Sequence, residues 1–191
     1  MSEKIFSLIK KKLEKRDELR EDIIKNSRPI IKESKQAIYA LHRDSFKEAK
    51  KYLDKAKAEL NRLKNILRKN PGLSVSMYNS AVQEYAEAYL YYFFVKENKL
   101  ISDIKLDVDP ENYLLGMCDL TGELARRAVF SVVNDNYNEV EKIKDFVSNI
   151  HTNFLNFDLR NSELRKKSDA IKWNLKKIEE VLYDLKIREK I

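Results

Sequence analysis

The stretch AVQEYAEAYLYYFFV at residues 81–95 decides the fold of this chain. Wound into a helix, it presents apolar or aromatic side chains on nearly every side, which is typical of a helix surrounded by other elements. Its only charged residues are Glu84 and Glu87, which lie three positions apart. The stretch therefore predicts a buried helix over about 75–97, with Ser74 as its N-cap.

Helical periodicity continues on both sides of this stretch. Further helices are predicted over 2–44, 45–69, 110–133, 137–155 and 161–188, while 98–108 forms a connection with at most a short helical turn. Asn70, Pro71 and Gly72 end the second helix, and Asp109 followed by Pro110 starts the fourth. Asn161 is the predicted cap of the last helix. Pro29 either kinks the first helix or splits it near Ser27.

The composition agrees with an all-α fold in a single domain, 1–191. Only three glycines and three prolines occur, too few for the turns of a sandwich, a barrel or a Rossmann fold. The net charge of +7 favours a polyanionic partner, or is a lysine-rich coat that keeps the protein in solution. No apolar run reaches membrane-spanning length, the N-terminus is too charged for a signal peptide, and Cys118 has no partner for a disulfide. We therefore expect a cytoplasmic protein that does not enter a membrane.

The last predicted helix carries an apolar seam at alternating spacings of four and three. This seam is either intramolecular core or a contact between subunits, and Cys118 and Trp173 are interpreted as packing residues. The seam consists of Ile171, Leu175, Ile178, Leu182 and Leu185.

Four carboxylates stand out because they interrupt apolar helices. Glu84 and Glu87 share one helix face, and Asp119 and Glu123, four residues apart, share a face of the 110–133 helix. Acidic residues are rarely buried unless they are paired or bind a metal. Gly116 precedes Asp119 by about one turn, where a small residue would let a second helix approach closely.

A hard divalent cation would relieve the repulsion among these four acids. All-oxygen ligands select Mg²⁺ or Mn²⁺ over zinc or copper. A di-iron site needs a Glu-x-x-His motif, and neither His42 nor His151 has that spacing. The alternative is that lysine or arginine side chains from neighbouring helices pair with the acids.

Several runs of the sequence resemble the translin/TRAX family. QEYAEA at 83–88, NYLLGMCDLTGELAR at 112–126 and SRPIIKESKQAIYALHR at 27–43 resemble TRAX, whereas residues 155–188 are similar to translin. The likeness extends from about residue 16 to 188. It implies an antiparallel bundle of about six to seven helices that assembles into a closed octameric shell.

The resemblance also implies an activity. TRAX provides the catalytic acids of a metal-dependent endoribonuclease, and these match Glu84, Glu87, Asp119 and Glu123. We therefore expect this chain to cleave RNA, single-stranded or in a short duplex, with Mg²⁺ or Mn²⁺. Because TRAX-like acids and a translin-like C-terminus occur in one chain, as expected of a single-gene prokaryotic or archaeal-type version, a homo-oligomer is favoured over assembly with a translin-like partner chain.

Basic side chains are the expected RNA contacts, since phosphate binding is largely independent of sequence. The alternative for each is a solvated helix face. His42 is either a phosphate contact or a capped surface histidine, of which the second is favoured, and the aromatic run at 91–94 is interpreted as core. The predicted contacts are Arg28, Lys32, Lys35, Arg43, Arg126 and Arg127.

Two other functions remain open. One is a non-catalytic, translin-like protein that binds single-stranded nucleic acid. The other is an all-α nucleoside triphosphate pyrophosphatase, which also uses paired glutamates and Mg²⁺, although its motif differs from the 112–126 run.

Overall fold

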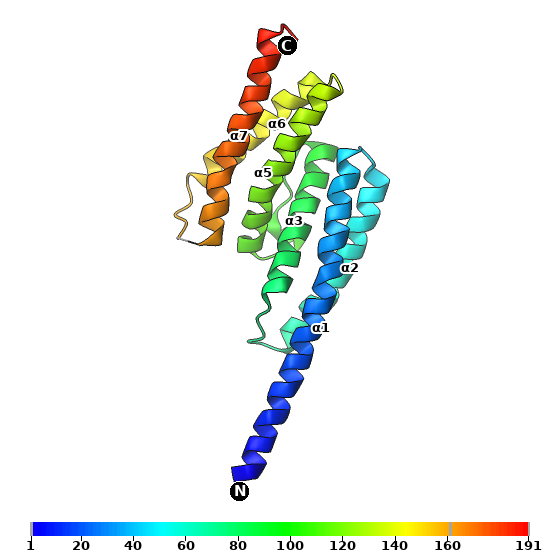
Figure 1. The fold of residues 1–191 in the computed structure, drawn as a ribbon, viewed down its shortest axis with the longest axis vertical. Helices are drawn as coiled ribbons and strands as arrows, with labels where there is room; N and C mark the ends of the chain where they lie inside the picture. The colour runs from blue at the N-terminus through cyan, green and yellow to red at the C-terminus, as the bar shows by residue number, and fades with distance from the viewer. Residues whose placement is uncertain (1, 161, 191) are drawn as a thin grey trace.

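The computed structural model describes residues 2–160 and 162–190, which form seven α-helices and no strand (Figure 1). The helices are α1 (Ser2–His42), α2 (Phe46–Lys69), α3 (Ser76–Glu97), α4 (Asp103–Leu106), α5 (Pro110–Val133), α6 (Tyr137–Phe154) and α7 (Glu163–Ile187). The predicted all-α fold is confirmed, and α4 is the short turn within the predicted connection.

The helix boundaries confirm most of the start and stop signals. The Asp109 side chain accepts from the Asn112 backbone N–H at 3.0 Å, and Pro110 opens α5 as predicted. The prediction for Ser74 is wrong: α3 starts after Val75, an extended residue without a side-chain cap. Asn161 lies outside the described residues.

Helix α1 runs through Pro29 without a break. On either side of the proline, Ile23 and Ile30 are fully buried, and the Ser27 hydroxyl donates to the Ile23 carbonyl at 2.8 Å. Packing therefore maintains the helix where proline removes a donor. The part over residues 3–18 is exposed throughout and projects away from the other helices (Figure 1).

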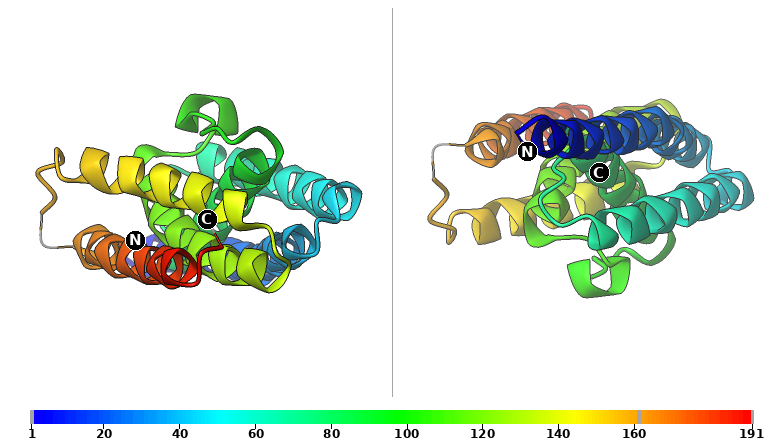
Figure 2. Two further views of the ribbon diagram at one scale, coloured as in Figure 1. Left: turned by 90° about the horizontal axis from the view of Figure 1, so that it is seen from above. Right: turned by 90° about the horizontal axis from the view of Figure 1, so that it is seen from below.

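Helix α3 lies in the middle of the bundle. It packs against α1, α2 and α5, and α5 in turn packs against α6 and α7 (Figures 1 and 2). Tyr85, Leu90 and Tyr91 are fully buried, which confirms the predicted buried helix. Although α3 is apolar, no helix in the described part of the chain has the length and hydropathy that a membrane crossing requires.

The apolar seam of α7 is intramolecular core. Ile171 and Ile178 are fully buried, and Leu175 and Leu185 nearly so, in the contact with α5 and α6. The interpretation of Trp173 as a packing residue is wrong, because 64% of its surface is exposed.

Candidate functional site

The site begins where α3 and α5 touch at Gly116. A Cβ on this glycine would lie 2.8 Å from the Glu87 amide nitrogen and 2.9 Å from both the Gln83 carbonyl oxygen and the Ala86 Cβ. Only glycine fits so close to a neighbouring backbone. Gly116 therefore sets the distance between the helices that carry the four acids, as its position predicted.

All four predicted acids line one pocket of about 540 Å³. Glu84 and Glu87 enter it from α3, and Asp119 and Glu123 from α5. Side chains of α1 and α7 complete its wall. Those two helices contribute Lys35, Ile38, Tyr39, Lys167, Ala170 and Asn174.

Two of the acids are paired with lysines from other helices. Lys35 of α1 lies 3.4 Å from Glu84, and Lys167 of α7 lies 2.6 Å from Asp119. The Gln83 amide also donates to Asp119, at 2.5 Å. The predicted alternative, in which basic side chains compensate the acids, is thus realised for these two carboxylates.

Glu123 has a different partner. Its Oε2 lies 2.5 Å from Nε2 of His42, and the Arg126 guanidinium is 3.8 Å away. The interpretation of His42 as a surface histidine is wrong, because only 6% of its side chain is exposed. Its position one turn after the buried Ile38 is the sequence signal for an inward-facing ring.

Glu87 is the most buried of the four acids, with 8% of its surface exposed. Burial, and then the negative charges of Asp119, Glu84 and Glu123, raise the pKa of Glu87 to about 9, although Lys167 opposes this. At neutral pH the Glu87 carboxyl therefore retains its proton unless another cation enters the pocket.

A divalent cation fits the pocket in its chemistry but not in its present side-chain conformations. Four carboxylates and a raised pKa on one of them are what such a cation would compensate. However, no three His, Cys, Asp or Glu side chains in residues 2–160 and 162–190 are grouped so that they could hold a metal ion. In the present conformations Glu84 and Asp119 are held by Lys35 and Lys167.

The predicted basic residues on α1 form an exposed row that leads to the pocket. Arg28, Lys32 and Lys35 are exposed at helical spacing, and Lys35 and Tyr39 line the pocket itself. Arg43 is also exposed, where it pairs with Glu48 at 3.2 Å.

Arg126 and Arg127, although adjacent, point in different directions. The Arg126 guanidinium lies at the pocket, 5.7 Å from the centre of the Tyr39 ring and 5.5 Å from that of Phe130. These cation–π contacts hold it in place while 46% of its side chain remains exposed.

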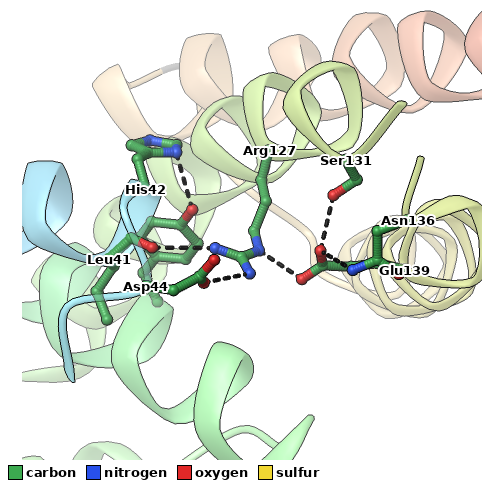
Figure 3. A network of polar contacts seen from close by, with 8 residues as sticks. Leu41, His42, Asp44, Arg127, Ser131, Asn136 and Glu139 are labelled. Atoms are coloured by element: carbon green, nitrogen blue, oxygen red, sulfur yellow. Dashed lines mark hydrogen bonds and ion pairs between the residues drawn. The ribbon is translucent and has the colours of Figure 1, made fainter. Parts of the chain in front are cut away.

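Arg127 is buried and its donors are used inside the protein. It donates to Glu139 at 2.5 Å, to Asp44 at 2.8 Å and to the Leu41 carbonyl at 3.0 Å (Figure 3). Arg127 therefore does not line the pocket, and its buried donors stabilise the fold instead of forming the predicted RNA contact. Its spacing of three from the buried Leu124 is the sequence signal for this inward position.

Comparisons with known proteins identify the family. The model of the Translin family matches residues 18–189. An uncharacterized protein of Methanocaldococcus jannaschii is 32% identical, over 93% of this chain and 82% of that protein. The translin-associated protein X homolog of Schizosaccharomyces pombe is 29% identical, over 98% of this chain and 89% of that protein.

Solved structures share the fold. The crystal structure of apo-NeC3PO superposes with a TM-score of 0.87 at 29% identity, covering 93% of this chain and 95% of that one. The structure of AfC3PO in complex with duplex RNA gives a TM-score of 0.88 at 24% identity, covering 96% and 97%. With a family match over almost its whole length, this chain belongs to the translin family.

Proposed function

We propose that this chain is a metal-dependent endoribonuclease whose active site is the acidic pocket. The observation that carries the proposal is the convergence of Glu84, Glu87, Asp119 and Glu123 on one pocket from two helices fixed by Gly116. These four residues would hold Mg²⁺ or Mn²⁺. When bound, such an ion activates water and offsets the negative charge of a phosphodiester.

The surroundings of the pocket support an RNA substrate. The row of Arg28, Lys32 and Lys35 along α1 provides cations that can bind successive phosphates, and Arg126 lines the pocket itself. The solved structure of AfC3PO, which shares the fold of this chain, is a complex with duplex RNA. Arg43 extends the same row as a further phosphate contact, although it pairs with Glu48 at 3.2 Å.

The assembly proposed for the chain is a homo-oligomer, with an octameric shell as the expected form. Part of the support is the exposed segment of α1, where 48–70% of the surface of each apolar residue remains in contact with water. A second copy of the chain would cover it; a translin-like partner chain is the alternative. The apolar residues are Ile5, Phe6, Leu8, Ile9 and Leu13.

Cleavage of a labelled single-stranded RNA in Mn²⁺ tests the proposed activity. Asp119→Asn and Glu123→Gln should each lower the rate by at least about 100-fold, because each removes a charged ligand. Glu141→Gln, an exposed acid on α6, is the matched control and should cleave like the wild type. Products with 5′-phosphate and 3′-hydroxyl ends are expected, whereas a cyclic phosphate would exclude attack by activated water.

A second candidate function is nucleic-acid binding without cleavage. It is favoured by one observation, that no three ligands in the described residues already form a metal site. RNA retained equally in EDTA and in Mn²⁺, and recovered intact from both, would establish this second function and refute the nuclease. Hydrolysis of nucleoside triphosphates in place of RNA would identify the pyrophosphatase, which the family assignment does not favour.

A further inference from the structure

One acid of the pocket, Glu123, is held by a polar side chain at the end of α1, outside the pocket. His42 Nε2 makes a contact of 2.5 Å with Glu123 Oε2. This contact joins residues 81 positions apart in the chain. The other carboxylate oxygen of Glu123, Oε1, has no hydrogen bond within the described residues.

The His42 ring is held from its opposite edge as well. Its Nδ1 lies 3.1 Å from the hydroxyl of Tyr91, a fully buried residue of α3. The rings of Tyr91 and Phe130 pack on it with centroids 5.2 Å and 5.8 Å away. With aromatic rings on two sides and a polar partner at each nitrogen, the imidazole has little freedom to turn.

One tautomer of His42 suits both of its contacts. Burial raises the pKa of the Tyr91 phenol well above its usual range, so the phenol retains its proton. In that tautomer the phenol O–H donates to Nδ1, and Nε2 carries the N–H directed at Glu123. A carboxylate that accepts from an N–H is held in one orientation.

Arg127 of α5 binds the backbone next to His42. This guanidinium donates to the carbonyl of Leu41, the residue before His42 (Figure 3). It also pairs with Glu139 of α6 and with Asp44, which follows α1. Since Arg127 lies one helical turn after Glu123, the end of α1 cannot move relative to Glu123 without breaking the contacts of Arg127 with Leu41 and Asp44.

We propose that His42 is a positioning residue that fixes Glu123 for metal binding, with Tyr91 and Arg127 supporting it. This inference rests on the proposed function. By donating to Oε2, the imidazole holds the Glu123 side chain in one rotamer, in which the other carboxylate oxygen has no hydrogen bond within the described residues. A ligand fixed beforehand loses less side-chain freedom when the metal binds, and partners of this kind change metal affinity or activity by about 10–100-fold.

Two substitutions of similar polarity separate positioning from packing. Glutamine at position 42 places an N–H donor near the position of Nε2, where it can still reach Glu123. Asparagine places its donor near Nδ1, where it reaches Tyr91 only. We therefore expect His42→Asn to weaken Mn²⁺ binding by about 10–100-fold relative to the wild type. His42→Gln should bind Mn²⁺ about tenfold more tightly than His42→Asn does.

The experiment measures Mn²⁺ affinity by titration calorimetry and thermal unfolding in EDTA, on the full chain and its assembly. Glu123→Gln and wild type run in parallel. The proposal is supported if the wild type binds Mn²⁺ most tightly, His42→Gln less tightly and His42→Asn least tightly, while both His42 variants unfold at similar temperatures. A purely structural role would instead lower both unfolding temperatures and both affinities together.

The outcomes separate the two proposals. If Glu123→Gln weakens Mn²⁺ binding but His42→Asn binds like the wild type, His42 does not position Glu123, while the metal site stands. If Glu123→Gln binds Mn²⁺ as tightly as the wild type, Glu123 is not a ligand and the proposed function itself is overturned.

Discussion

Replacing Gly116 with alanine tests whether the α3–α5 contact is as tight as it looks. The added Cβ would lie within 2.9 Å of two backbone atoms and one Cβ of α3, none of which can move without shifting that helix. Overpacking of this kind costs about 1–3 kcal/mol, and the higher helix propensity of alanine returns about 1 kcal/mol. Because the contacted atoms belong to the backbone or to a Cβ and cannot move aside as a flexible side-chain end could, we expect a cost of about 2–3 kcal/mol, and hence a net loss of stability of about 1–2 kcal/mol or a Tm lower by about 2–8 °C.

Gly122 is the matched control on the same helix. A Cβ there would meet only the Asn174 side-chain nitrogen, at 3.7 Å, which is an ordinary contact. Gly122→Ala should therefore raise stability by up to about 1 kcal/mol through helix propensity alone. Urea unfolding followed by circular dichroism, at equal protein concentration, measures both variants. Equal shifts for the two, or a Gly116→Ala variant as stable as the wild type, would refute the close approach.

Two more predictions concern buried charge. The pKa of Glu87 is raised from 4.5 to about 9 in the folded chain, so the folded state binds the extra proton and stability in EDTA should fall as pH rises from about 4.5 to about 9. Glu87→Gln should flatten that decline in urea titrations at several pH values; an unchanged slope would contradict the shift. Arg127→Met should lower stability by about 2–3 kcal/mol by leaving Glu139 without its cation. Arg127→Lys should recover only part of this in the same assay, because lysine lacks the forked donors, and full recovery would argue against the network.

Most of the helices were predictable because they are long and periodic. The start of α5 at Pro110 follows from local chemistry, and the buried helix over 81–95 from its composition. The prediction of Ser74 as the N-cap of α3 was wrong because serine is only preferred at that position, and here the chain stays extended through Val75. The four acids were recognisable because two helices each present a pair on one face.

The partners of those acids were not predictable in the same way. Lys167 reaches Asp119 across 48 positions, and His42 reaches Glu123 across 81. Such pairs depend on how the helices pack, which no local pattern specifies. Arg126 and Arg127 differ because adjacent residues on a helix point about 100° apart.

The exposed part of α1 is stabilised by little besides its own helical hydrogen bonds. Over residues 3–18 every residue is exposed, and the only hydrogen bond from this segment to another part of the described chain is the one from the Arg16 guanidinium to the Gly72 carbonyl, at 2.8 Å. The packed remainder of α1 supplies the helical nucleus, so each further turn adds little free energy in either direction. In a single chain we therefore expect the helical turns before Arg16 to open and re-form. A surface that covers Ile5, Leu8 and Leu13 would draw this equilibrium toward the full helix, which links the helicity of the segment to association.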